Sequence, residues 1–305
     1  MTLSVSTTLH AATAATDTNG GRLHIVATLA PLASLASMVA GEHATVTTLL
    51  TSNADPHDFQ LKPSQRVQLM NADLVIGVGP TLEGRIWEGS TNTRKPFRIL
   101  QLQSLTTLSI LQNRGFDLHT ADHAHDHTQN NLHTIDPHMW LSIKNAKQIV
   151  LAITNHLIKV APAKISVWQK NSNAAIAQLS TLEKDLQKEM QPLKKLRYII
   201  SHDGYQYFEK EYGLAPAGLV ALDNEHIPSA RRLNELRKQV LNTKIDCVFY
   251  EKRLGEQYVA LLTENTAIKK IPLDHLGVSG VTQNQAIYPA LLRQLASSFS
   301  SCQTL

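Results

Sequence analysis

The feature that most constrains the fold is a regular alternation of two residue patterns along the 305-residue chain. Short runs of β-branched and apolar residues predict strands, and segments with apolar residues three and four apart predict helices. Strands that alternate with helices in this way are typical of parallel sheets covered by helices. The sequence therefore predicts an α/β fold with two open, mostly parallel sheets, one in each half of the chain.

The expected elements follow from pattern, capping residues and proline positions. Strands are expected at 23–28, 44–50, 72–79, 97–100, 197–201, 216–221, 246–251 and 271–273. Helices are expected at 31–40, from 62–64 onward, at 142–160, 205–212, 229–241 and 255–265, and in a closing segment that ends at Ser300.

One helical pattern is much longer than the others. After Pro162 the chain continues to about Met190 without Gly or Pro, which as a helix spans on the order of 40 Å. We expect this segment to link two lobes. The predicted organisation is a signal remnant or disordered N-terminus at 1–21, an N-terminal lobe at 22–160, a linking helix at 161–191 and a C-terminal lobe at 192–305.

Charge and hydropathy restrict the partners. The formal net charge is +4 and the pI is near 9.0, but Lys and Arg are spread thinly, so we expect no nucleic-acid partner. The apolar stretch at 25–40 is interrupted by Pro31, so no membrane-spanning segment is expected.

The N-terminal segment is expected to be part of an export signal. Residues 1–21 carry small residues typical of a cleavage site but no Lys or Arg before Arg22, which indicates a signal whose beginning is missing or a mis-assigned start. No cysteine lies near this segment, so we expect no lipid anchor.

Two cysteines, Cys247 and Cys302, lie late in the chain. They are interpreted as a disulfide, which would indicate an oxidising compartment, or alternatively as two buried thiols. A disulfide across roughly 55 residues would stabilise the fold by about 4 kcal/mol.

Histidines stand at the predicted strand ends. Asp-Pro-His occurs twice, ending at His57 and His138, and His202 directly follows a predicted strand. Asp274 and His275 follow another. Proline narrows the backbone directions open to the next residue, and ligands of open parallel sheets lie outside the carboxyl ends of the strands. Any one of these histidines alone would be interpreted as structural, but together they indicate a metal site.

Three neutral imidazoles with a carboxylate or a water form a tetrahedral site that suits Zn²⁺. The neighbouring acidic residues Asp55, Asp136 and Asp203 are candidates to hold the second ring nitrogen of a ligand. Alternatively they are turn and capping residues, an interpretation favoured for Asp55 and Asp136.

A second histidine-rich region covers residues 119–133. Its alternating His and Asp show no apolar periodicity, which predicts a solvated loop with weak metal affinity. The candidate ligands are His119, His123, His125, His127 and His133.

Several stretches together resemble one family, the ZnuA-type zinc-specific solute-binding proteins of bacterial ABC importers, within the wider cluster of zinc- and manganese-binding proteins. The resemblance covers nearly the whole chain after Arg22. The matching stretches are Ala54-Asp55-Pro56-His57, Leu61-Lys62-Pro63-Ser64, Asn71-Ala72-Asp73-Leu74, Asp136-Pro137-His138-Met139-Trp140-Leu141-Ser142, Ser201-His202-Asp203-Gly204-Tyr205, Tyr207-Phe208-Glu209-Lys210, Cys247-Val248-Phe249-Tyr250-Glu251 and Leu273-Asp274-His275-Leu276-Gly277.

The resemblance implies two lobes joined by a rigid helix, with the metal in the cleft between them. It implies Zn²⁺ ligand roles for His57, His138 and His202 and a nearby carboxylate role for Asp274. It also implies a periplasmic, monomeric, non-enzymatic protein whose partner is the membrane permease of an ABC importer with its cytoplasmic ATPase. The cysteine pair matches a disulfide position in some members, and the loop at 119–133 lies where zinc-type members carry a His-rich insertion.

The sequence departs from the family pattern at a few positions. His275 replaces a usual Pro beside Asp274, and we interpret it as a harmless substitution rather than an alternative ligand. Lys252-Arg253 stands where a Pro-Gln pair is common, and Ile143 alters the turn after Ser142.

Other functions remain open at this point. A manganese or broad-specificity importer component and an adhesin share the same pattern. A zinc hydrolase is a different class, for which Asp274 or Glu225 would serve as base, but the sequence has no His-Glu-x-x-His motif.

Overall fold

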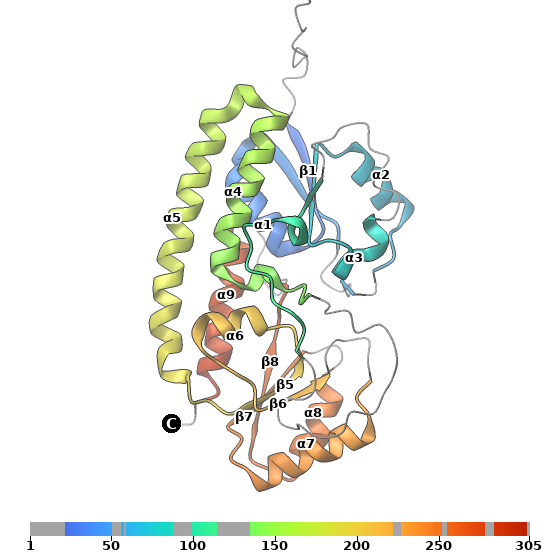
Figure 1. Ribbon diagram of the computed structural model, residues 1–305, viewed down its shortest axis with the longest axis vertical. Helices are drawn as coiled ribbons and strands as arrows, with labels where there is room; N and C mark the ends of the chain where they lie inside the picture. Colours follow the sequence, from blue (N-terminus) through green and yellow to red (C-terminus); the bar gives the residue numbers. More distant parts are fainter. Residues whose placement is uncertain are drawn as a thin grey trace, which may run out of the picture.

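The chain folds around two parallel sheets of four strands each (Figure 1). The computed structural model describes residues 22–50, 56–57, 59–87, 99–114, 135–221, 227–251, 255–277 and 284–303. The first sheet has the order β2-β1-β3-β4, with strands β1 Leu23–Ala27, β2 Ala44–Thr48, β3 Leu74–Gly77 and β4 Ile99–Gln101. The second has the order β6-β5-β7-β8, with strands β5 Tyr198–His202, β6 Gly218–Ala221, β7 Cys247–Glu251 and β8 Lys269–Leu273.

Helices connect and cover these strands. Their bounds are α1 Ala30–Ala40, α2 Pro63–Asn71, α3 Pro80–Trp87, α4 Ile143–Val160, α5 Ile165–Met190, α6 Gln206–Tyr212, α7 Ala230–Asn242, α8 Glu256–Thr263 and α9 Asn284–Ser300. The predicted α/β class is confirmed, since every strand pair in both sheets is parallel.

One helix was not predicted from the sequence. In α3, Glu83 has non-helical backbone angles and divides the helix at a kink, and Gly84 follows it, so the segment lacks a helical pattern. Its Glu83 carboxylate instead accepts hydrogen bonds from the backbone N–H groups of Val78 and Gly79, at 3.1 and 2.8 Å, and from the indole of Trp87 at 3.1 Å. Tertiary contacts of a buried carboxylate, rather than helix propensity, hold this segment in place.

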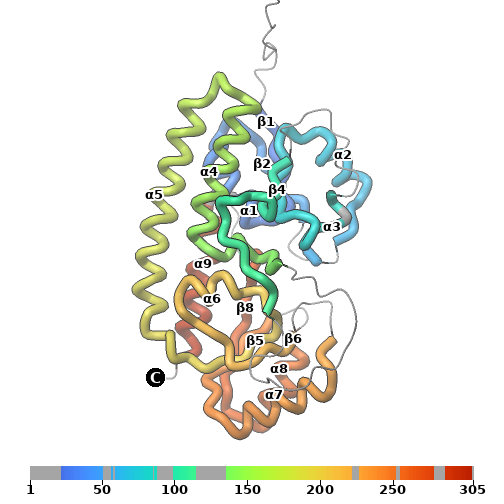
Figure 2. Tube along the Cα trace, in the orientation of Figure 1, coloured from blue at the N-terminus to red at the C-terminus, as the bar shows by residue number. Residues whose placement is uncertain are grey.

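The long helix expected after Pro162 is confirmed as α5, which has 26 residues. It runs alongside both halves of the molecule, as the tube in Figure 2 makes clear. Its buried residues recur at helical spacing and pack on α1, α4 and α9. These buried residues include Trp168, Ala175, Leu179, Leu182, Leu186 and Met190.

Helix α9 ties the end of the chain to the first half. It packs against α1 and α5, and one hydrophobic cluster includes buried residues of both sheets. The backbone N–H of Tyr288 donates to Ser34 Oγ at 2.9 Å, and its hydroxyl donates to the Trp140 carbonyl at 2.8 Å. The two halves therefore share a core.

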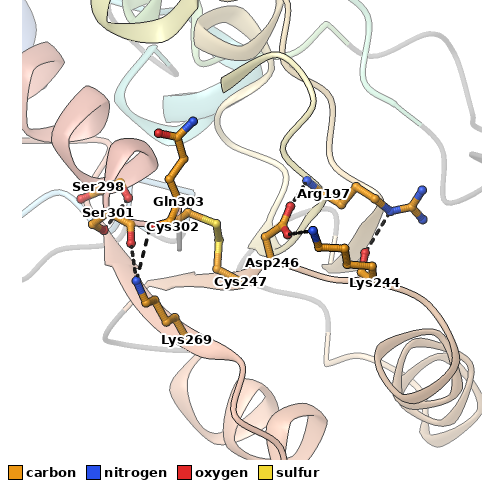
Figure 3. Close-up of a disulfide and its surroundings, with 9 residues drawn as sticks. All are labelled: Arg197, Lys244, Asp246, Cys247, Lys269, Ser298, Ser301, Cys302 and Gln303. Atoms are coloured by element: carbon orange, nitrogen blue, oxygen red, sulfur yellow. Dashed lines mark hydrogen bonds and ion pairs between the residues drawn. A yellow bond between two sulfur atoms is a disulfide. The ribbon is translucent and has the colours of Figure 1, made fainter. Parts of the chain in front are cut away.

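A disulfide joins Cys247, the first residue of β7, to Cys302, just after α9 (Figure 3). The interpretation as a disulfide is thereby confirmed. Both cysteines are fully buried. Lys269 donates to the carbonyls of Ser301 and Gln303 beside the bridge, which further holds the chain end against β8. The disulfide thus anchors α9 to the second sheet.

We expect the double variant Cys247→Ala/Cys302→Ala to lose about 4 kcal/mol of unfolding free energy, because the unfolded chain regains the entropy of an open 55-residue loop. Urea unfolding of the oxidised wild type and the variant measures the difference. Reductant should lower the wild-type midpoint toward that of the variant and leave the variant unchanged. Equal midpoints in oxidising buffer would show that the bridge does not stabilise the fold.

Candidate metal centre

The three histidines singled out from the sequence lie together. The ring centroids of His57 and His138 are 5.4 Å apart, those of His57 and His202 are 5.7 Å apart, and those of His138 and His202 are 5.0 Å apart. One ring nitrogen from each lies within 4.8 Å of the other two. Residues separated by up to 145 positions in the sequence are thus brought into one cluster that could hold a metal ion.

Each ring reaches the cluster from a different element. His57 lies in the connection between β2 and α2, and His138 immediately precedes a short 3-10 helix at Met139–Leu141. His202 is the last residue of β5 and comes from the second half. His138 and His202 are 2% and 1% exposed, whereas His57 is half-buried. The cluster therefore joins the two halves, with His57 nearest to solvent.

Asp136 orients the ring of His138. Its Oδ1 lies 2.9 Å from both the backbone nitrogen and Nδ1 of His138. Asp136 was expected either to stabilise the turn or to hold the ring, and its carboxylate contacts both the backbone and the ring of His138. Burial lowers the pKa of His138 well below its usual value and raises the pKa of Asp136 to about 6. A neutral imidazole with Nδ1–H donating to Asp136 leaves the lone pair of Nε2 available to a metal ion.

Glu251, the last residue of β7, ends one of the stretches that resemble the family but was not predicted to be part of the site. Its Oε1 lies 2.9 Å from Nδ1 of His202 and 2.9 Å from Nδ1 of His275, and it accepts a hydrogen bond from the Tyr205 hydroxyl at 2.9 Å. The strand order explains this position, because β7 lies between β5 and β8. The carboxyl end of β7 therefore falls between His202 and His275.

The charge of Glu251 is set by its two histidine neighbours. Burial alone would raise the pKa of Glu251, but His275 and His202 hold it well below its usual range. Burial alone would also lower the pKa of His202, but the Glu251 carboxylate raises it above its usual value. The second half of the site is thus built around a buried, ionised carboxylate.

His275 and Asp274 take different positions after β8. His275 is 5% exposed, and its ring centroid lies 5.4 Å from that of His138 and 5.6 Å from that of His202. Asp274 Oδ1 instead accepts hydrogen bonds from the backbone N–H groups of Leu276 and Gly277, at 2.8 and 3.0 Å. Within the described ranges, a second group of candidate ligand atoms within 4.8 Å of one another consists of His202, Glu251 and His275, and Asp274 belongs to neither group.

Asp203 does not hold a histidine ring but binds a cation from the first half. Its carboxylate forms a short ion pair with the guanidinium of Arg114, which also contacts Glu209 at 2.7 Å. Arg114 Nε donates to both oxygens of Asp203, at 3.0 and 3.2 Å. The ion pair neutralises two buried carboxylates, of which Asp203 directly follows His202, and links the two halves beside the site.

Gly204 leaves room for two of the rings. A Cβ atom at this position would lie 2.7 Å from Cε1 of His202 and 3.2 Å from Nε2 of His138. The first distance is too short for a side-chain contact, so even alanine would press on the ring. The absence of a side chain at Gly204 is therefore part of the site geometry.

Other sequence predictions cannot be compared with the structure. Asp55 and Glu225, and the loop candidates His119, His123, His125, His127 and His133, lie outside the described residues. Among the helices that are described, none has the length and apolar character needed to cross a membrane.

Comparisons with known proteins agree on one family. The model of the family described as "ZnuA: Zinc-uptake complex component A periplasmic" matches residues 25–302. The high-affinity zinc uptake system protein ZnuA of Yersinia pestis is 31% identical over 288 residues, covering 91% of this chain and 90% of that protein. The protein of the same name from Paracoccus denitrificans is 27% identical and covers 91% of each chain.

Solved structures share the fold. A crystal structure of ZnuA superposes with a TM-score of 0.76 at 20% identity, covering 93% of this chain and 100% of that one. A Zn(II)-bound mutant variant of AdcAII from Streptococcus pneumoniae gives a TM-score of 0.75 at 21% identity, covering 92% and 100%. From the family match over residues 25–302 and the Yersinia pestis relative, we conclude that this chain belongs to the ZnuA family of periplasmic zinc-uptake components.

Proposed function

We propose that this protein captures Zn²⁺ in the periplasm and delivers it to an ABC-type zinc importer, with His57, His138 and His202 as metal ligands. The observation that carries this proposal is the convergence of these three imidazoles from both halves, with one ring nitrogen of each within 4.8 Å of the others. Family membership supports the same function, since the matched family and its relatives are named for zinc uptake.

The donor atoms favour zinc over harder cations. Imidazole nitrogen suits Zn²⁺, whereas Mn²⁺ prefers carboxylate, carbonyl and water oxygens. Asp136 on His138 and Glu251 on His202 hold the rings through Nδ1, an arrangement that fixes ligand orientation and raises ligand basicity. Rings held in this way need little ordering when the ion arrives, which favours tight binding.

The proposed role is binding and release rather than catalysis. A catalytic zinc site needs a general base within reach of the bound water. Among the described residues, Asp136 and Glu251 are the carboxylates that contact the cluster, each 2.9 Å from a ring Nδ1, and Glu251 Oε1 also accepts from the Tyr205 hydroxyl. A carboxylate held in this way serves to position ligands. The partner is accordingly a membrane permease with its cytoplasmic ATPase, which receives the ion from a monomeric carrier.

We expect each of the single variants His57→Ala, His138→Ala and His202→Ala to weaken zinc binding at least about 100-fold, because each loses one ligand of the ion. Competition titration with a chromogenic chelator measures the dissociation constants. His156→Ala is the matched control, since His156 lies on α4 and bonds to the Ala152 carbonyl of the same helix. Unchanged affinity in all three variants would remove the basis for the proposed site.

Gly204→Ala should weaken zinc binding while keeping all three ligands, because the added methyl group displaces His202 and crowds Nε2 of His138. We expect a loss on the order of 10- to 100-fold, as for other changes that disturb ligand orientation. Gly84→Ala is the control, since a Cβ there meets no atom within 4 Å. If both variants bind zinc like the wild type, Gly204 does not shape the site.

Manganese should compete poorly. An excess of Mn²⁺ of about 100-fold over Zn²⁺ should leave zinc bound, because the proposed ligands are nitrogen donors. Calorimetric zinc titration with and without Mn²⁺ tests this expectation. Displacement of zinc at that ratio would support a broad-specificity or manganese carrier instead.

A further inference from the structure

We propose that His275 supplies a fourth imidazole to the metal centre, so that nitrogen atoms alone hold the ion and Asp274 is not a ligand. This inference rests on the proposed function, because it names the donor set of the same site. It reverses the interpretation of His275 as a harmless substitution.

The spacing of the rings supports this inference. A tetrahedral ion bound by ring nitrogens at about 2.1 Å places neighbouring ring centroids about 5 Å apart. The centroid of His275 lies 5.4 Å from that of His138 and 5.6 Å from that of His202. These values match those among His57, His138 and His202, which range from 5.0 to 5.7 Å. His275 thus lies at a ligand-like ring spacing from His138 and His202, and its side chain shares a second group of candidate ligand atoms, within 4.8 Å of one another, with His202 and Glu251.

The contacts of the His275 ring determine which of its nitrogens is available to an ion. Its Nδ1 lies 2.9 Å from Glu251 Oε1, as does that of His202. Because one carboxylate oxygen lies at hydrogen-bond distance from both ring nitrogens and also accepts from the Tyr205 hydroxyl, each ring donates to it from Nδ1 and presents a lone pair on Nε2. Nε2 of His275 is buried and has no hydrogen-bond partner among the described residues, as is also true of His138 and His202. A buried acceptor without a donor is costly, and a shared cation would satisfy all three.

The Asp274 carboxylate bonds to the backbone of the turn that follows it. Its Oδ1 accepts from the backbone N–H groups of Leu276 and Gly277, and Gly277 has a φ of +67°. The carboxylate thus stabilises the turn that follows His275. The Trp140 indole donates to the His275 carbonyl at 2.9 Å and fixes the backbone from the other side. Asp274 is therefore a positioning residue for His275.

The charge balance supports a shell of neutral ligands. Four neutral imidazoles leave the full charge of Zn²⁺ on the centre. Two carboxylates lie one hydrogen bond beyond the rings, Asp136 behind His138 and Glu251 behind both His202 and His275. These anions can offset the charge of the ion without entering its coordination shell.

The test compares His275→Gln with Asp274→Asn, using Zn²⁺ alone as the probe. Glutamine removes the imidazole, whereas asparagine keeps the oxygen that accepts from Leu276 and Gly277 but removes the carboxylate charge. We expect His275→Gln to weaken zinc binding about 100-fold and Asp274→Asn to change it less than about threefold. His156→Gln is the matched control for the histidine substitution. Circular dichroism and thermal melting establish that each variant is folded.

Zinc-edge X-ray absorption of the wild-type protein provides a second measurement that does not depend on any variant. Scattering from imidazole carbons should fit four rings and no carboxylate oxygen, and the His275→Gln spectrum should lose one ring. If His275→Gln does not fold, the wild-type spectrum decides alone.

Three results would overturn the inference. Tight binding in His275→Gln with a large loss in Asp274→Asn would assign the fourth position to Asp274. Tight binding in both variants, or a wild-type spectrum with three imidazoles, would assign it to water or to another oxygen, including that of Glu251. In each of these cases the proposed function still stands, provided that His57→Ala lowers the zinc affinity as predicted. Failure of the wild type to bind zinc would instead reject the proposed function, and this inference with it.

Discussion

The contact between Glu251 and the rings of His202 and His275 determines the geometry of the second half of the site. One carboxylate oxygen accepts from Nδ1 of both histidines and from the Tyr205 hydroxyl. Without this anion, two buried imidazoles would be free to choose either tautomer and would lose their common orientation. The two histidines leave Glu251 ionised although it is buried, so the three groups depend on one another. Removing any one of them leaves the others buried without a hydrogen-bonding or charged partner, which is unfavourable.

The same interdependence extends across the two halves. Arg114 from the first half neutralises Asp203 and Glu209 from the second, and Tyr288 of α9 bonds to Ser34 and Trp140. These contacts connect segments that carry or adjoin the cluster of His57, His138 and His202. The site therefore depends on the packing of the two halves against each other, to which α5 and α9 contribute through their contacts with α1 and with one another.

Much of this arrangement could be predicted from the sequence. The alternation of strand and helix patterns predicted the eight strands of the two sheets within a few residues, and Asp-Pro-His repeats and a strand-end His pointed to His57, His138 and His202. Helix α3 could not be predicted, because Glu83 holds it through contacts with Val78, Gly79 and Trp87 that no local pattern encodes.

The role of Glu251 also required the fold, because only the strand order places β7 between β5 and β8. The contact of His275 Nδ1 with Glu251 Oε1 depends on the same strand order. The sequence also does not show that the Asp274 carboxylate bonds to the backbone of Leu276 and Gly277. Residues at strand ends could therefore be predicted from local patterns. A residue such as Glu251 could not, because its hydrogen-bond partners come from neighbouring strands.

The unequal burial of the imidazoles has a consequence for how fast an ion can leave. His138, His202 and His275 are at most 5% exposed, whereas His57 is half-buried. In the proposed site, an incoming water or a donor atom of an acceptor protein would approach from the side of His57, the least buried of the four rings. Ligand exchange would then begin at that ring, while the three enclosed rings keep their positions.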